Sequence, residues 1–176
     1  AHFDRNICKD LEKTYLDNLS YADIIGIRDV STRFDYTPCP SCNLIKAGNF
    51  FNENPQNKLV YYEHNNYKLP KIFPGKKLRN TETDIKKILR FLGSARVVVT
   101  NTYHGVYWSL LLGKKVYCLP FSSKFDNFKS LDNYNLLSDK TIPENLFEDY
   151  LPRKKFLNEC LNLNDKFFLK VKNLIS

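Results

Sequence analysis

The residue types needed for acid–base chemistry on an anion occur together in the middle of the chain. An apolar segment, 97–99, leads through small polar side chains to a histidine and a glycine: Thr100, Asn101, Thr102, Tyr103, His104 and Gly105. Three β-branched residues in a row are typical of a buried parallel strand, and threonine and asparagine commonly begin helices. In such sheets ligands bind beyond the carboxyl ends of the strands, where the first turn of a helix offers free N–H groups to anions. We therefore expect His104 to face a bound anion; the alternative is a capping turn in which its ring packs against the core.

Polar and charged residues also follow two further apolar segments. These segments are 116–121 and 21–27, and five residues come directly after them: Ser122, Ser123 and Lys124, and Arg28 and Asp29. If the strand ends meet at one edge of a sheet, these side chains form a convergent site. Arg28 and Lys124 are then best suited to hold an anion. Asp29 orients Arg28 or acts as a base, or else forms an ordinary surface ion pair.

The elements that must position these residues alternate between apolar strands and helical patterns. Strands are predicted near 58–63, 96–100 and 115–120, with a further strand at 21–29. We predict an α/β fold with a mainly parallel, Rossmann-like sheet and helices on its faces. His64, at the end of the first of these strands, either contacts a second substrate or lies on the surface.

Apolar residues at helical spacing predict the helices. Their ranges are 4–19, 85–92, 106–112 and 156–174. Residues 81–84 are interpreted as a capping box for the second helix, and Gly113 is a residue type that often follows a helix end. The third helix has almost no polar face, so Tyr107 and Trp108 are expected to pack rather than to stack on a sugar. Residues 30–57 are rich in Asn, Pro, Ser and Cys and are predicted to be irregular.

Five cysteines, an odd number, lie at positions 8, 39, 42, 118 and 160. Cys118 and Cys160 fall in apolar patterns and are predicted to be packed thiols. The spacing of Cys39 and Cys42 is that of half a zinc site, but no second pair completes four ligands. A structural turn is therefore favoured over metal or redox chemistry, and the thiols suit a reducing cytoplasm. We expect no metal and no organic cofactor.

The net charge is +8, from 27 Lys and Arg against 19 Asp and Glu, and it favours partners that carry negative charge. The basic residues are dispersed, and their largest clusters, 68–79 and 153–155, are predicted to be solvated faces. No nucleic-acid-binding motif is visible, and no apolar stretch approaches the ~18 residues of a membrane span. We therefore expect no nucleic-acid partner and no transmembrane segment.

Three stretches together resemble one known family. They are 22–29, 94–105 and 111–116, the last followed by a Ser-Lys-Phe turn, and their order and spacing match over residues 15–130. In these stretches the chain is similar to the polysaccharide pyruvyl transferase family. The resemblance implies a two-lobed fold like that of the GT-B glycosyltransferases. It also implies transfer of a pyruvyl group from phosphoenolpyruvate to a sugar diol, which forms a cyclic ketal on a surface glycan.

For that reaction His104 is the expected acid and base, since positioned proton transfer typically contributes ~10²–10⁴-fold. Many members of the family have an arginine two residues before the histidine, where this chain has Thr102. A sugar-nucleotide donor on the same fold is therefore an alternative, and a non-catalytic binding module is another. In each enzyme reading the donor is anionic and phosphorylated, and the acceptor is a glycan or a lipid-linked sugar.

The resemblance also predicts how the chain is organised. A two-lobed enzyme needs more than 176 residues, so we expect this chain to be part of a longer one. Residues 1–45 are assigned to the end of an N-terminal lobe and the crossing segment. Residues 46–176 are assigned to the C-terminal lobe, with a final helix that packs back across the lobe boundary. The expected location is the cytoplasm or the inner membrane surface.

Overall fold

The computed structural model describes residues 14, 17–19, 21–28, 34–70, 74–137, 147 and 154–176, with the side chain of Ser123 excepted. Its elements in chain order are β1 (Gly26–Ile27), β2 (Asp35–Tyr36), α2 (Cys42–Gly48), β3 (Asn57–Glu63), β4 (Lys76–Arg79), α3 (Ile85–Gly93), β5 (Ala95–Thr100), α4 (Tyr103–Leu111), β6 (Lys115–Cys118), the 3₁₀ helix η1 (Ser123–Phe128), β7 (Tyr134–Leu136) and α5 (Lys155–Leu174). Most of the predicted helix 4–19 lies outside the described residues.

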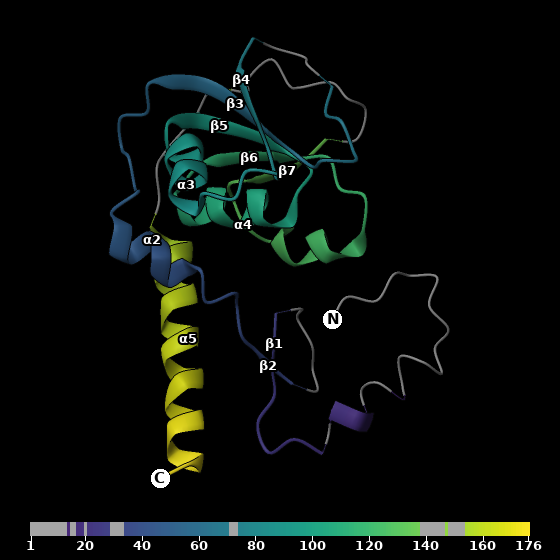
Figure 1. The fold of residues 1–176 in the computed structure, drawn as a ribbon, viewed down its shortest axis with the longest axis vertical. Helices are drawn as coiled ribbons and strands as arrows, with labels where there is room; N and C mark the ends of the chain where they lie inside the picture. Colours follow the sequence, from purple (N-terminus) through teal and green to yellow (C-terminus); the bar gives the residue numbers. More distant parts are fainter. Residues whose placement is uncertain are drawn as a thin grey trace.

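The main sheet has five parallel strands in the order β4-β3-β5-β6-β7 (Figure 1). β5 is central because its side chains alternate between two buried faces: Val97 and Val99 on one, Val98 on the other. The chain leaves β3 toward β4 and then returns to the other side of β3 to form β5. This reversal makes a topological switch point between the carboxyl ends of β3 and β5. The three strands predicted near 58–63, 96–100 and 115–120 are confirmed.

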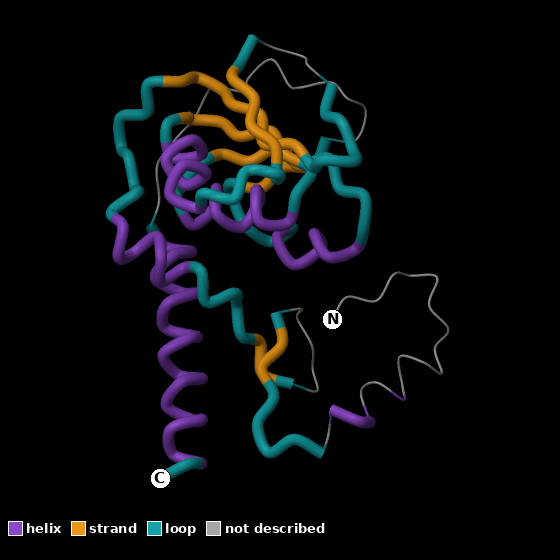
Figure 2. Tube along the Cα trace, in the orientation of Figure 1, coloured by secondary structure: helices purple, strands orange, loops and turns teal. Residues whose placement is uncertain are grey.

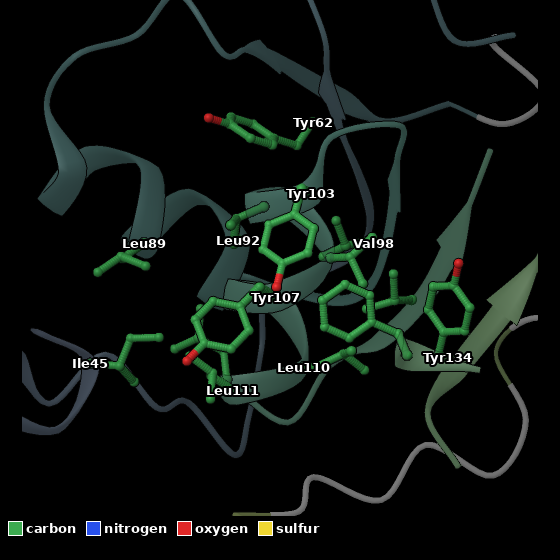
Figure 3. Close-up of a cluster of buried hydrophobic side chains, with 14 of the residues drawn as sticks. Ile45, Tyr62, Leu89, Leu92, Val98, Tyr103, Tyr107, Leu110, Leu111 and Tyr134 are labelled. Carbon is green, nitrogen blue, oxygen red and sulfur yellow. The ribbon is translucent and has the colours of Figure 1, made fainter. Parts of the chain in front are cut away.

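The described helices cover one face of this sheet (Figure 2). Side chains of α2, α3 and α4 pack there with Tyr62 and Val98 of the sheet (Figure 3). Leu157 and Cys160 of α5 belong to the same cluster. On the opposite face the described residues that pack are Leu69, Leu137 and neighbours in loops. The predicted α/β fold with a parallel sheet flanked by helices is thus confirmed. In the part of the chain that the structure describes, the helices pack on one face, and loop side chains help to bury the other.

Helix α4 lies between the sheet and the other helices, which explains why it has almost no polar side. Tyr107 and Leu111 are fully buried there. Its first turn is capped by Thr102, whose hydroxyl accepts the Gly105 N–H at 2.9 Å. Just beyond its end, Gly113 has φ 70°, a conformation that favours glycine. The predicted helix and its end are confirmed.

Several predicted elements differ from the structure. Within the predicted strand 21–29, only β1 is a strand in the described residues. It pairs with β2 in a separate two-stranded sheet and not with the main sheet. The irregular segment 30–57 contains α2, which forms because Cys42 and Ile45 are buried against α4 and α5. The cap of α3 is Asp84 rather than Thr81, and the Asp84 carboxylate accepts the N–H groups of the first turn.

The final helix, α5, joins the core at its beginning and leaves it toward its end (Figure 1). Leu157 and Cys160 are buried against α2 and α4. Farther along, the ring of Phe167 lies so close to Gly26 of β1 that an added Cβ there would stand 2.7 Å from it. The described part of α5 thus contacts both the sheet domain and the segment that precedes it. Among the described helices, none has the length and apolar character needed to cross a bilayer.

The assigned boundary between residues 45 and 46 falls inside α2. Cys42 and Ile45 belong to the same buried cluster as the sheet, so α2 packs as part of the sheet domain. The segment before it, 34–41, is where the chain passes from β2 into that domain.

Candidate functional site

A hollow of about 360 Å³ lies at the switch point, beyond the carboxyl ends of the strands. We name it the His104 hollow, and its lining comes from the segments that follow β3, β4, β5 and β6 and from α3 and α4: Tyr62, His64, Asn80, Glu82, Thr83, Ile85, Ile88, Thr102, Tyr103, His104, Trp108 and Lys124. This is where ligands bind in parallel α/β sheets. A larger hollow, of about 790 Å³, lies between the β1 segment and the end of α5, but its lining offers one Lys–Asp pair and little other chemistry.

His104 is the second residue of α4 and is half-buried. Its ring lies 4.7 Å from the Trp108 ring, centroid to centroid, and 5.5 Å edge-on from that of Tyr103. Its Nε2 lies 3.8 Å from the sulfur of Cys39. The imidazole is therefore held on two sides by aromatic rings and contacts a thiol, while it still lines the hollow.

Cys39 is tied into the same site by a chain of contacts. Its sulfur is 3.2 Å from the Ser41 hydroxyl, which accepts the Trp108 indole N–H at 2.9 Å. The backbone carbonyl of Cys39 accepts a hydrogen bond of 2.7 Å from the Tyr107 hydroxyl. The hydrogen bond with His104, helped by Ser41 and opposed by burial, lowers the pKa of the Cys39 thiol to about 7. The contact with His104 thus favours the thiolate form of Cys39.

Two cations lie together near the hollow. The Arg28 guanidinium stacks 4.6 Å above the Tyr103 ring, and the Asn127 side chain donates to the Arg28 carbonyl at 3.2 Å. The Lys124 ammonium lies 4.9 Å above the Phe121 ring. Burial and the neighbouring Arg28 lower the pKa of Lys124. Like charges gathered in this way are stabilised when an anion binds between or beside them.

The small polar residues before His104 serve the fold. Thr100 and Thr102 are buried; the Thr100 hydroxyl accepts the Thr102 N–H at 3.1 Å, and Thr102 caps α4. A Cβ on Gly105 would stand 2.3 Å from the Thr100 hydroxyl, so this turn requires glycine. Thr102 and Tyr103 also line the hollow with their accessible atoms, although both are mostly buried.

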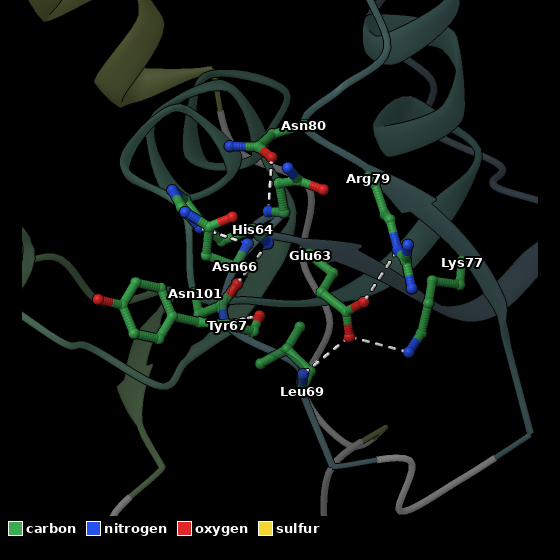
Figure 4. A network of polar contacts seen from close by, with 10 residues as sticks. Glu63, His64, Asn66, Tyr67, Leu69, Lys77, Arg79, Asn80 and Asn101 are labelled. Carbon is green, nitrogen blue, oxygen red and sulfur yellow. Dashed lines mark hydrogen bonds and ion pairs between the residues drawn. The ribbon is translucent and has the colours of Figure 1, made fainter.

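Asn101 holds the loop that carries His64 (Figure 4). Its side-chain oxygen accepts the His64 N–H at 2.8 Å, and its amide donates to the Tyr67 carbonyl at 2.7 Å. The exposed rings of Tyr67 and Phe121 stack at 4.6 Å, and the His64 ring lies against both. These three rings form an aromatic wall at the rim of the hollow.

The fully buried Glu63 fixes the other end of that loop. Its carboxylate accepts from the Leu69 N–H at 2.8 Å and from the Lys77 ammonium at 2.9 Å, with Arg79 at 3.4 Å (Figure 4). Burial raises the pKa of Glu63, but the hydrogen bonds from Lys77 and Leu69 and the two cations outweigh it, so the pKa lies below its ordinary value. This network is structural because the buried Glu63 carboxylate joins the Leu69 N–H to two cations whose side chains are partly exposed on the surface.

The structure brings most of the predicted site residues to one place. His104, Tyr103, Thr102, His64 and Lys124 line the hollow, and Arg28 lies beside it. Three others belong to the supporting layer: Thr100, Asn101 and Gly105. Ser122 precedes η1 and does not line the hollow, while Asp29 and the side chain of Ser123 lie outside the described residues.

Two side chains that can take part in acid–base or nucleophilic chemistry were not predicted as site residues from the sequence. Glu82 places a carboxylate in the hollow, where its hydrogen bond with Lys87 lowers its pKa. Cys39, interpreted as part of a turn, contacts His104 from 65 residues away in the sequence. The spacing Cys39-x-x-Cys42 was the available signal, but nothing local linked it to the histidine.

Comparison of the chain with protein-family models finds no match, and comparison with curated proteins finds none either. Within the described residues, no group of three or more His, Cys, Asp and Glu side chains is placed to hold a metal ion.

Proposed function

We propose that residues 46–176 form the C-terminal lobe, and residues 1–45 the end of the N-terminal lobe, of a GT-B-like transferase that moves a pyruvyl group from phosphoenolpyruvate to a sugar of a surface glycan. The observation that carries the proposal is the His104 hollow, where a half-buried histidine and Lys124 line one space beyond the strand ends, with Arg28 alongside. A proton-exchanging group next to cations is what a reaction on a phosphorylated carboxylic acid requires. The motif resemblance supplies the name of the reaction.

Each side chain then has a role that its position permits. Lys124 and Arg28 hold the phosphate and carboxylate of the donor. His104 delivers a proton to the methylene carbon of the donor, one sugar hydroxyl adds to the neighbouring carbon, and its proton passes to His104. The second hydroxyl then replaces phosphate on that carbon and closes the ketal, and the phosphate leaves with the proton of that hydroxyl. The aromatic wall of His64, Tyr67 and Phe121 offers apolar faces to the sugar ring.

The volume of the hollow admits the proposed donor. At about 360 Å³ it lies within the roughly 300–1,000 Å³ that pockets for small molecules span. A second lobe facing the hollow would complete the acceptor site beside the aromatic wall and exclude water.

The test is an isotope-traced assay in the intact protein. Phosphoenolpyruvate labelled in its three carbons is compared with a panel of labelled sugar nucleotides, using glycan and lipid-linked sugar acceptors. Label from phosphoenolpyruvate in an acid-labile ketal supports the proposal. Label transferred only from a sugar nucleotide would replace it with a glycosyltransferase, and binding of either donor without turnover would leave a binding module.

A further inference from the structure

The pair Cys39 and Cys42 has a use that the proposed transfer does not require. Both are free thiols that begin the turn into α2, and the Cys42 N–H points to the Cys39 carbonyl at 3.4 Å. A turn of this kind brings its end Cα atoms within about 7 Å. Disulfides span Cα distances of about 4.4–6.8 Å, so side-chain rotation can join these two sulfurs.

The two thiols differ in the way that a reactive pair needs. Cys39 is half-buried, next to exposed Pro40, and its sulfur contacts His104 in the hollow. Cys42 is fully buried, and its sulfur lies 3.5 Å from the side-chain amide of Asn164 on α5. Burial raises the pKa of Cys42, while that of Cys39 is lowered. Cys39 is thus the attacking nucleophile, and the buried Cys42 is the resolving cysteine.

We propose that Cys39 and Cys42 form a reactive dithiol that reduces small disulfides, with Cys39 as the attacking sulfur and His104 as the side chain in contact with it. In the first step the Cys39 thiolate attacks one sulfur of a disulfide RSSR, and RS⁻ leaves. In the second step the Cys42 sulfur, losing its proton to solvent or base, attacks the Cys39 sulfur of the mixed disulfide, and a second RS⁻ leaves. The protein dithiol is oxidised by two electrons, and RSSR is reduced to two thiols.

Oxidation has a consequence for the hollow. A disulfide with Cys42 uses the sulfur of Cys39 that now lies 3.8 Å from Nε2 of His104, and a disulfide sulfur carries no negative charge. The ring of His104 then loses its thiolate partner. The dithiol stands on its own geometry and does not depend on the proposed transfer.

The experiment uses the full chain in a Cys8→Ser background with glutathione disulfide as the probe, followed by peptide mapping. The parent protein is expected to form the Cys39–Cys42 disulfide. Cys42→Ser is expected to trap a glutathione adduct on Cys39, and Cys39→Ser to react far more slowly. Cys160→Ser is the matched control, because Cys160 is buried beside Cys42 and should not change the outcome.

A second measurement follows alkylation of Cys39 by iodoacetamide against pH. The titratable groups that face Cys39 are His104 and Tyr107 of α4, Cys42 of α2 and Cys160 of α5. The rate should be half-maximal near pH 7, rather than near 9.0 as for an ordinary thiol. Without His104, a smaller fraction of the Cys39 thiol is ionised at pH 7, but the thiolate that remains is more nucleophilic. His104→Asn should therefore slow the reaction at pH 7 about sixfold.

Two results would overturn the proposal. One is a mixed disulfide that forms equally on Cys118 or Cys160 in the folded protein. The other is a Cys39 rate profile centred near 9.0, the ordinary value for a thiol. Both readouts are independent of transferase turnover, so failure of the transfer proposal leaves this one open to its own test.

Discussion

The residues at the ends of two neighbouring strands, β3 and β5, have opposite roles. At the end of β3, Glu63 is fully buried and its carboxylate meets an N–H and two cations. At the end of β5, His104 is half-buried, and its ring nitrogen has a long contact of 3.8 Å with a thiol. The first group is enclosed by protein partners, whereas the second faces a hollow.

This difference separates a residue that shapes a site from one that can act in it. A buried charge with its partners in place holds the 64–69 loop, and removing a partner is costly. A half-buried imidazole with one weak partner can exchange that partner for a ligand at little cost. The energy that orders the hollow therefore comes from Glu63, Asn101 and the capped turn, while the chemistry falls to His104 and its cations.

The sharpest way to test this comparison is His104→Ala. Turnover in the intact protein should fall by ~10²–10⁴-fold, because a proton-transfer group acts on the transition state. The free energy of unfolding should change by only about 1 kcal/mol, because the ring is half-buried. Steady-state kinetics and urea unfolding measure the two quantities.

His64→Ala is the matched control, since it removes the other imidazole of the same hollow. It should affect acceptor KM more than kcat. Equal kcat losses for both variants would show that His104 has no special role.

Glu63→Gln tests whether the buried carboxylate stabilises the fold of the site. Removing the charge weakens the hydrogen bonds of a buried group with Lys77 and Leu69, at a cost of about 1.5–3 kcal/mol in unfolding free energy; solvent screens the partly exposed cations that remain. Exposed Glu53→Gln should cost almost nothing. Urea titration of both variants at pH 7 gives the result, and a small loss for Glu63→Gln would mean that the loop is held by other contacts.

The same carboxylate predicts an acid dependence. The folded pKa of Glu63 lies below its ordinary value of 4.5, so the stability that it contributes is complete above that pH. That contribution is lost as the pH falls through the folded pKa. Unfolding free energy of the parent should therefore drop below pH 4.5 more steeply than that of Glu63→Gln. Parallel pH curves would contradict this assignment.

The sheet could be predicted because its signals are local. The run Val97–Val99, the capped turn at Thr102 and the glycine after α4 each read correctly from a few adjacent residues. The N-cap of α3 could not be predicted in this way, because Thr81 and Asp84 are both good capping residues. Which of them caps the helix depends on where the helix meets the core. Helix α2 was missed because only contacts with α4 and α5 bury Cys42 and Ile45.

The site could be predicted where parallel strand ends converge and not elsewhere. His104 and Lys124 follow adjacent strands, so topology alone brings them together. Arg28 reaches the same place although its strand is outside the main sheet, by stacking on Tyr103. The contact between Cys39 and His104 depends on how α2 docks, which no local pattern encodes.

Lys124→Ala tests whether the cations hold the donor. A charge-assisted contact to phosphate contributes roughly 1.5–3 kcal/mol, so the donor Kd should rise about ten- to a hundredfold while acceptor binding stays nearly constant. Lys129→Ala is the matched control, because Lys129 follows the same 3₁₀ helix but is exposed and paired with Asp126. Isothermal titration with phosphoenolpyruvate measures both, and equal affinities would remove Lys124 from the site.

The smallest expected effect is that of Thr102, two residues before His104. Its hydroxyl is occupied by the Gly105 N–H, so Thr102→Ala should lower the unfolding free energy by about 1 kcal/mol, as loss of a helix cap does. Donor affinity should change less than twofold, because the cap hydroxyl has no free direction toward the hollow. Thr102→Ser keeps the cap and should restore stability in urea titrations. If Thr102→Ala instead weakened donor binding tenfold at unchanged stability, Thr102 would belong with His104 and Lys124. It would then count among the residues that bind or act on the donor, and not among those that only stabilise the site.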